Sequence, residues 1–520
     1  MARIERTKNA TRNIVFGFIL KLYQVFVPFL MRTAMIYFMG IQYLGLSSLF
    51  TSILQVLNLA ELGVGSAMVF SMYKPIAEDD KATICALMRL YKLYYRTIGL
   101  VIAACGCILL PFIPHLIKGD VPEGINIYVL YVLNLAATVF SYWLFAYKNS
   151  VLAAHQRTDI NSKVNLITST IQFVLQFIVL WLLRNYYIYV MIALFAQILT
   201  NIVTAIVANR FYPEFKPVGK LSKEEIKSIN KRIKDLFTAK IGEVIVNSAD
   251  TIVISAFLGL TVLAIYQNYY YILTSIIGFV TIIFSACTAG IGNSLIVETR
   301  QKNFNDLKKF TFIITWIAGF CSCCFLNLFQ PFMRIWVGEG LMLKYTAVVC
   351  FVVYYFIYEV NQLLNLYKDA GGIWHEDRFR PLATALANLG MNVVLVQFWG
   401  IYGVLLSTVL SMLFVGMPWL FHNLFTTLFE KKQLNSYLRR LLFYFIISMG
   451  VCVMSVLICK QINCGNWGTL FLRLIICLII PNVSFIIIYH NKIEYKETLV
   501  LVNSITKGKF IGVLRKLGMK

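Results

Sequence analysis

Two basic residues stand inside the first long apolar run of the sequence, where a charged side chain is costly. Lys21 and Arg32 are eleven positions apart, so at about 100° per residue they share one face of a helix, roughly 16 Å apart along its axis. Pro28 lies between them and removes one helical hydrogen bond, which predicts a bend or hinge there. A bent, cationic helix suits a carrier that binds an anionic group in one state and releases it in another. The structural alternative is that both side chains snorkel to the membrane interfaces.

Acidic and amide residues form a second pattern within apolar sequence. Glu243, Asn247 and Asp250 recur at steps of four and three, which places them on one face of a helix. A carboxylate at membrane depth needs a cation, a proton or a hydrogen-bond partner, so we expect either ion coupling or a tie between neighbouring helices. Glu61, on the predicted second helix beside a run of small residues, and Glu359 on the predicted tenth helix are further cavity candidates.

The composition indicates a membrane protein. Hydrophobic residues make up 59% of the 520 residues and charged residues only 14%, and the apolar runs exceed the roughly 20 residues that cross a bilayer. Lys and Arg outnumber Asp and Glu by 47 to 24, but the basic residues lie mainly between apolar runs. We therefore interpret the excess as topology information and expect no nucleic-acid partner. The basic N-terminal residues lead into an apolar run too long for a cleavable signal.

Parts of the sequence recur 220 residues further along the chain. Tyr147-Lys148-Asn149, followed by His155, matches Tyr367-Lys368-Asp369, followed by His375. Pro111-Phe112 matches Pro331-Phe332 in the same register. A duplicated membrane unit is a common way to build a secondary transporter. The repeat therefore predicts a carrier with two lobes.

The apolar runs predict an all-α polytopic membrane protein of about fourteen membrane helices. Six helices fall in each repeat and two lie beyond it. The domains expected are an N-lobe at 1–209, a basic cytoplasmic linker at 210–235, a C-lobe at 236–421, an extra helix pair at 422–490 and a cytoplasmic tail at 491–520. The predicted helices are Asn13–Met39, Leu44–Phe70, Leu93–Leu116, Ile125–Tyr147, Val164–Leu183, Ile188–Ala208, Leu236–Leu258, Ala264–Ile291, Phe310–Gln330, Thr346–Tyr367, Leu382–Phe398, Tyr402–Leu420, Leu441–Ile458 and Trp467–Tyr489.

The placement of positive charge predicts the orientation. Most of the 47 Lys and Arg residues lie in the tails and in alternate loops, which places both termini in the cytoplasm. The opposite loops hold only a few basic residues, namely Lys118, Arg184, Arg334, Lys344 and Lys460. Because six helices per repeat give both lobes the same orientation, we expect a pseudo-twofold axis along the membrane normal.

The loops favour a carrier over an enzyme. The outward-facing connections are short, whereas a membrane glycosyltransferase or polymerase needs an external loop that carries catalytic residues. The sequence has no Walker-type phosphate loop and no metal-spaced cluster of His, Cys and Asp. The 12 Cys residues lie mostly in apolar runs, where cysteine behaves as a small packing residue.

Several motifs resemble one transporter family. The run from Asn247 to Ser255, continuing through Phe257-Leu258-Gly259 to Tyr270, looks like the start of the second lobe of bacterial polysaccharide flippases. The stretch from Tyr367 to Trp374 with the later run from Gly400 to Thr408 is similar to that family as well. So are Glu61-Leu62-Gly63 and the run from Pro331 to Gly338. The chain thus resembles the Wzx-like O-antigen and polysaccharide transporters of the MATE-like MOP superfamily.

This resemblance implies a flippase in the bacterial cytoplasmic (inner) membrane. Its expected substrate is an undecaprenyl-diphosphate-linked oligosaccharide unit for O-antigen, capsule or exopolysaccharide, moved by alternating access. It further implies a cationic cavity for the diphosphate, no cofactor, an H⁺ or Na⁺ gradient as driving force, and a lipid-tail groove at the two extra helices. Membrane lipids, a polysaccharide polymerase and chain-length proteins are the expected partners. A MATE-type multidrug or cation antiporter is the alternative, and a glycosyltransferase or polymerase is a more distant one.

Overall fold

The computed structural model describes residues 6–119 and 121–505, and no β-strand occurs in this part of the chain. For a few of these residues, Glu243 and Asn247 among them, the structure describes the backbone but not the side chain. The helices form two compact units. Unit 1 comprises residues 1–267 and 392–400, and unit 2 comprises 268–391 and 401–520.

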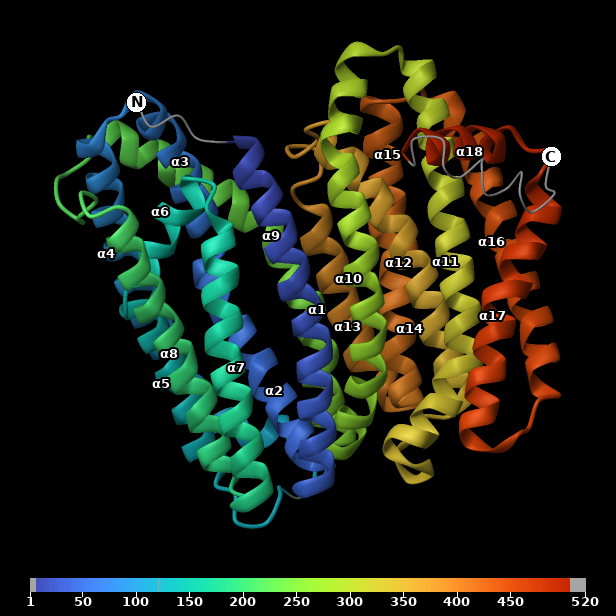
Figure 1. The fold of residues 1–520 in the computed structure, drawn as a ribbon, viewed down its shortest axis with the longest axis horizontal. Helices are drawn as coiled ribbons and strands as arrows, with labels where there is room; N and C mark the ends of the chain where they lie inside the picture. Colours follow the sequence, from blue (N-terminus) through green and yellow to red (C-terminus); the bar gives the residue numbers. More distant parts are fainter. Residues whose placement is uncertain (1–5, 120, 506–520) are drawn as a thin grey trace. The chain divides into compact units, whose positions relative to one another are not determined.

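Unit 1 is built mainly from the first nine α-helices (Figure 1). Its helices are α1 (Arg6–Phe38), α2 (Ile41–Leu57), α3 (Val64–Glu78), α4 (Lys81–Leu109), α5 (Ile127–Trp143), α6 (Asn149–Ala154), α7 (Thr158–Leu182), α8 (Tyr186–Phe211) and α9 (Lys223–Leu258). The first turns of α10 (Leu260–Val297) and the last turns of α13 (Arg380–Trp399) also belong to this unit. Helix α1 packs along α7, and α9 packs against α2 and α3.

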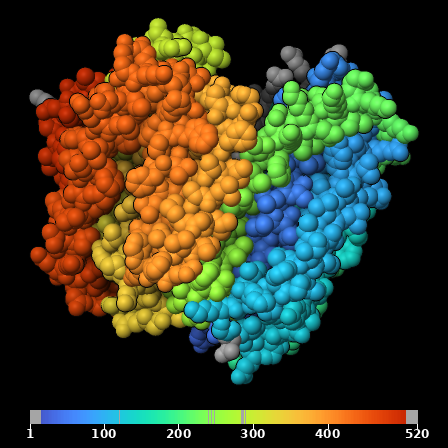
Figure 2. Space-filling model, turned by 180° about the vertical axis from the view of Figure 1, so that it is seen from behind, coloured from blue at the N-terminus to red at the C-terminus, as the bar shows by residue number. Residues whose placement is uncertain are grey.

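Unit 2 holds the remaining parts of α10 and α13 and the other helices. These are α11 (Arg300–Val337), α12 (Tyr345–Ala370), α14 (Ile401–Ser411), α15 (Met417–Thr427), α16 (Lys431–Lys460), α17 (Gly465–Tyr489) and α18 (Ile493–Ile505). One π-helical turn, Met412–Gly416, joins α14 to α15. The C-terminal pair α16 and α17 packs against α11, and Figure 2 shows it in red at the edge of its unit.

The helices confirm the multi-pass membrane fold. Within the described residues, twelve helices are long and apolar enough to cross a membrane, or up to thirteen if one bent pair counts as a span. The bent pair is Ile127–Trp143 with Ala146–Ala154, which meet at 47°. The number fourteen, the pseudo-twofold axis and the lobe boundaries stay predictions.

Several predicted helix boundaries are wrong, among them the starts of α4, α11 and α16, and in two cases the structure shows a local reason. The run Leu44–Phe70 is not one helix, because α2 ends at Leu57 and a 3₁₀ turn, Asn58–Glu61, precedes α3. Gly63 then takes a left-handed conformation with φ of 86°, which glycine adopts at little cost. Helix α9 begins at Lys223 instead of Leu236, because Ser222 and Glu225 form a capping box that satisfies the first backbone N–H groups.

Buried aromatic and apolar side chains form the core of each unit. In unit 1, Leu152, Ile160, Val164 and Ala208 form a cluster where α6, α7 and α8 meet. In unit 2 the larger cluster joins α11 to α16 and α17 through Phe312, Cys323, Tyr444, Val451, Cys452, Phe485 and Tyr489. The extra C-terminal helices are therefore fixed to their unit by ring packing as well as by chain connection.

Candidate functional site

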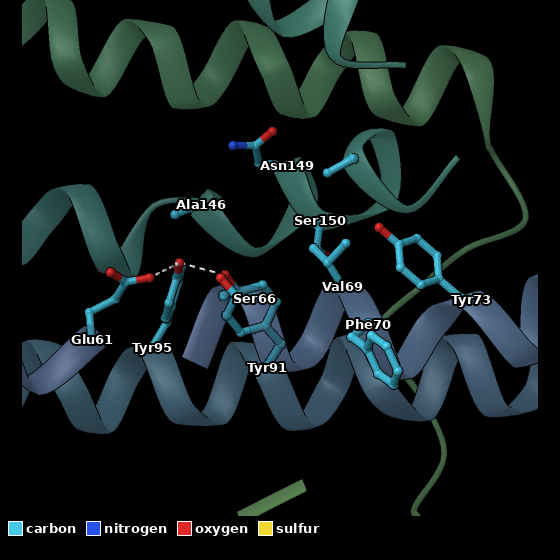
Figure 3. A pocket seen from close by; sticks show the side chains of 12 residues that line it. Glu61, Ser66, Val69, Phe70, Tyr73, Tyr91, Tyr95, Ala146, Asn149 and Ser150 are labelled. Carbon is cyan, nitrogen blue, oxygen red and sulfur yellow. Dashed lines mark hydrogen bonds between the residues drawn. The ribbon is translucent and has the colours of Figure 1, made fainter. Parts of the chain in front are cut away.

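A polar cavity of about 530 Å³ opens within unit 1 between α3, α4 and the short helix α6 (Figure 3). Its volume lies within the range of about 300–1,000 Å³ that ligand pockets occupy. A carboxylate, four aromatic rings, two serines and an amide contribute to the lining. The lining residues are Glu61, Gly65, Ser66, Val69, Phe70, Tyr73, Tyr91, Tyr95, Ala146, Asn149, Ser150 and Ala153.

Three oxygen atoms converge on one wall of this cavity. The Tyr91 hydroxyl donates to the Tyr95 hydroxyl at 2.5 Å, and Tyr95 donates to Oε1 of Glu61 at 3.2 Å (Figure 3). Gly65 lies beneath them, and a Cβ there would come within 3.0 Å of the Tyr91 hydroxyl and 3.2 Å of Glu61 Oε1. A glycine at this position therefore leaves the space in which the oxygens meet.

The break between α2 and α3 is what brings Glu61 to the cavity. Glu61 ends the 3₁₀ turn, so its side chain leaves the direction that a continuous second helix imposes. A Cβ on Gly63 would lie 2.7 Å from Cβ of Leu236, so the glycine allows close contact with α9. The structure places Glu61 at the lining of this cavity, and its predicted position on an unbroken second helix is wrong.

The two tyrosines were not identified from the sequence. Tyr91 and Tyr95 are four residues apart in α4, which places both rings on the same face. This spacing is the signal that was available. The spacing indicates a site only together with the contact to Glu61, which is 34 positions from Tyr95 along the chain.

The predicted basic pair lies on α1, which continues as one helix through Pro28. Arg32 and Lys21 are both partly buried. The Arg32 guanidinium donates to the backbone carbonyl of Gln267 at 3.5 Å. Helix α1 is attached to α7 by a hydrogen bond of 2.9 Å between the hydroxyls of Tyr23 and Thr170. Neither basic residue lines the cavity around Glu61.

The other acidic candidates lie on α9 and α12. Asp250 is buried on α9 and accepts a hydrogen bond of 2.7 Å from the amide of Asn392 on α13. The side chains of its predicted companions Glu243 and Asn247 lie outside the described residues. Glu359 is 1% exposed on α12 of unit 2, and its Oε1 has no hydrogen-bond partner among the described residues.

A second cavity of about 390 Å³ lies between α2, α5 and α8. Hydroxyl and amide side chains line it, and none of the lining residues is charged. Asn58 at its edge accepts a hydrogen bond of 3.2 Å from Tyr142, whose ring packs edge-on against Tyr95 at 5.3 Å. Polar side chains therefore continue from the uncharged cavity towards the Glu61 cluster.

The sequence matches a known family. A family model described as a polysaccharide biosynthesis protein covers residues 10–288, which is more than half of the chain. The chain belongs to the polysaccharide biosynthesis protein family. A comparison of the sequence with curated proteins finds no match.

Solved structures share the fold of this polysaccharide biosynthesis protein. The lipid II flippase MurJ in an inward closed conformation is similar with a TM-score of 0.64 and 14% identity, covering 92% of this chain and 99% of MurJ. An inward-facing MATE multidrug transporter of the MOP superfamily has a TM-score of 0.62 and 14% identity, over 80% of this chain and 99% of its own. A MOP-superfamily transporter from Pyrococcus furiosus has a TM-score of 0.53 and 13% identity, over 82% and 96%.

These matches confirm the family resemblance drawn from the motifs. The polysaccharide biosynthesis protein has the fold of MOP-superfamily membrane transporters. Because the identities are low, the structural likeness establishes the fold, and the substrate is a separate question.

Proposed function

We propose that this protein is a flippase that moves an undecaprenyl-diphosphate-linked oligosaccharide across the bacterial cytoplasmic membrane by alternating access. The observation that carries the proposal is membership in the polysaccharide biosynthesis protein family together with a transporter fold. Polysaccharide units are made on lipid carriers inside the cell and used outside it. A transporter in this pathway therefore needs a cargo with a lipid, an anionic linker and a glycan. In this proposal the protein performs no covalent chemistry.

The basic residues of α1 support binding of the diphosphate. Arg32 lies partly buried in an apolar helix, where a charged side chain is rare and usually functional. The guanidinium forms bidentate hydrogen bonds with phosphate oxygens. Lys21, on the same face of the helix, supplies a second positive charge. We therefore assign binding of the diphosphate to Arg32 and Lys21, and we assign a hinge between them to Pro28.

The C-terminal helix pair supports a lipid cargo. Helices α16 and α17 leave an apolar cavity of about 460 Å³ between them, lined mainly by aliphatic side chains. The lining residues are Ile446, Ile447, Gly450, Val451, Met454, Ser484, Ile487 and Ile488. An acyl or prenyl chain fits such a groove because its contacts need no polar partner.

An H⁺ or Na⁺ gradient is the proposed driving force. Asp250 and Glu243 are its first candidates, because a carboxylate at membrane depth binds a proton or a cation. Asn247 is a further candidate, since its amide oxygen can coordinate a cation. Glu359, buried in unit 2, is a further candidate. Membrane lipids, a polymerase and chain-length proteins remain proposed partners, and both termini are proposed to lie in the cytoplasm.

A cation exporter is a second candidate function, favoured by one observation. The cavity around Glu61 combines a carboxylate with aromatic rings, and none of the described residues that line it is basic. Aromatic faces and carboxylates attract organic cations. A MATE multidrug transporter also shares the fold.

The deciding experiment locates the lipid-linked oligosaccharide in cells that lack the protein. We expect complete units to accumulate in the inner leaflet, and intact protein to restore their outward movement. Arg32→Ala should lower flipping by about tenfold, the effect of losing about 1.4 kcal/mol, at unchanged protein level. Arg300→Ala, at an exposed position of α11, serves as the control. Units that reach the outer leaflet without any flippase would turn the assignment towards cation export.

A further inference from the structure

We propose that the cavity around Glu61 binds a sugar residue of the transported glycan and prefers neutral or amino sugars to acidic ones. This inference rests on the proposed flippase function and names a glycan-binding site for it. The diphosphate is assigned to α1, whereas this cavity lies between α3, α4 and α6. The two sites therefore recognise different chemical parts of one cargo.

The oxygen cluster accepts the donors that sugars present. Oε1 of Glu61 and the hydroxyls of Tyr91 and Tyr95 converge above Gly65, as the close distances from its ideal Cβ position show. A carboxylate accepts hydrogen bonds from hydroxyl or ammonium groups, and tyrosine hydroxyls both donate and accept. A hydroxyl or ammonium group of a pyranose therefore matches this wall of the cavity.

Aromatic rings supply the apolar wall. Phe70 and Tyr73 are 56% and 47% exposed, and their rings lie 5.9 Å apart at a steep angle. The Arg232 guanidinium stands 4.4 Å from the Phe70 ring and also donates to the hydroxyl of Ser71. Aromatic faces carry negative potential and attract the weakly positive C–H groups of a sugar ring. We assign the stacking contact to Tyr73.

Polar side chains of α6 complete the opposite wall. The hydroxyl of Ser150 donates to the carbonyl of Tyr147 at 2.7 Å, which fixes its rotamer. Asn149 accepts a hydrogen bond from Asn161 through its amide oxygen, so its amide N–H groups are directed by that contact. A sugar between α4 and α6 thus meets oriented groups instead of mobile ones, which lowers the entropy cost of binding.

The charge of the lining predicts selectivity among sugars. Among the described residues that line the cavity, Glu61 is the one carboxylate and none is basic. Two cations act on members of this set: the positive charge of Lys240 acts on Glu61, and the Arg232 guanidinium lies over the Phe70 ring. A uronic acid places a second carboxylate near Glu61, where like charges repel. An amino sugar gains an ion pair there.

The test measures binding of three methyl glycosides to purified full-length protein in detergent by saturation-transfer NMR. The probes are those of glucosamine, glucose and glucuronic acid. We expect glucosaminide to bind about tenfold more tightly than glucuronide, which corresponds to about 1.4 kcal/mol. Glu61→Gln should remove that difference, and Tyr73→Leu should weaken all three glycosides. Glu78→Gln makes the same chemical change on α3 at an exposed position outside the cavity and should alter nothing.

Several results would overturn the inference. One is equal binding of the three glycosides, or a preference that survives in Glu61→Gln. Another is binding of tetraphenylphosphonium that depends on Glu61 while no glycoside binds, which favours cation export. Thermal unfolding of each variant in the same detergent separates loss of the site from loss of the fold. The leaflet experiment remains independent, because it reports on flipping even if no free glycoside binds.

Discussion

Asp250 is a buried side chain with two candidate roles, ion coupling and helix packing. The residue is 9% exposed, and its carboxylate accepts a hydrogen bond from Asn392, which lies 142 positions away in the sequence. That bond ties α9 to the end of α13. The same side chain is a candidate for ion coupling, because a carboxyl group at membrane depth can bind a proton or a cation.

Asp250→Asn separates the two roles. The amide preserves the size of the side chain but removes its charge, so we expect the stimulation of flipping by a proton or sodium gradient to fall about tenfold, on the scale of 1.4 kcal/mol. Vesicles with imposed gradients provide the measurement. Asp79→Asn, at an exposed position, is the control. Full gradient response in Asp250→Asn would assign the residue to helix packing alone.

At the scale of elements, glycine decides how closely helices approach in unit 1. A Cβ on Gly45 of α2 would lie 2.2 Å from the backbone carbonyl oxygen of Leu260 at the start of α10. Backbone atoms cannot move aside as a flexible side chain does. The contact therefore fixes the distance between α2 and the turn after α9.

Gly45→Ala should destabilise the protein by about 1–3 kcal/mol, because overpacking forces the backbones apart. The apparent melting temperature in detergent is the measurement. Gly17→Ala is the matched control, since nothing lies within 4 Å of a Cβ at Gly17 of α1. There alanine should leave stability unchanged or raise it by up to about 1 kcal/mol. Equal melting temperatures for the two variants would refute the close approach.

The turn between α6 and α7 carries a pH-sensitive contact. His155 packs on Tyr212 with ring centroids 4.2 Å apart. Burial lowers its pKa below the usual 6.5, although a hydrogen bond to the carbonyl of Val151 and the charge of Glu214 act in the opposite direction. The native state therefore takes up a proton less readily than the unfolded chain does.

The lowered pKa of His155 in the native state predicts that the protein loses stability in acid. The contribution of His155 is complete above about pH 6.5 and declines as the pH falls below it, since the unfolded state then binds more protons. Melting temperatures between pH 7.5 and 5 should fall less steeply in His155→Gln than in the intact protein. His375→Gln, at the repeated but exposed position, should retain the original profile. If melting temperature falls with pH as steeply in His155→Gln as in the intact protein, His155 does not contribute to the acid response.

At the scale of the whole molecule, the fold of MOP-superfamily transporters does not by itself state which ends face the cytoplasm. The distribution of Lys and Arg predicts the orientation, through the rule that cytoplasmic loops are the more positive. The predicted orientation is testable by reporters in loops that the structure places between helices.

Alkaline phosphatase inserted at Gly119 or Gly340 should be active, because both positions lie in loops predicted to face outward. The same enzyme at Asp79 or Gly219 should be inactive, and green fluorescent protein at those positions should fluoresce. The opposite pattern at all four sites would invert the topology. A mixed pattern would show that one or more predicted spans do not cross the membrane.

The sequence by itself determined the class of fold, the family and the positions of most helices. A bilayer requires about 20 consecutive apolar residues in helical form, so composition along the chain is enough to locate spans such as α1 and α17. The motifs around Asn247 and Pro331 then pointed to the correct family. Single buried charges such as Asp250 and Glu359 were also visible, because they interrupt apolar sequence.

The tertiary structure alone decided which of these residues meet. Gly63 allows a close contact with α9, and a pattern of apolar residues does not contain that contact. From the sequence, Tyr91 and Tyr95 are ordinary packing residues, and only the fold shows that Glu61 lies beside them. Asn392 likewise gains its role only from Asp250, far away in the sequence. Hydropathy records the cost of leaving water for the membrane one residue at a time, whereas a site depends on distances between residues that only packing brings together.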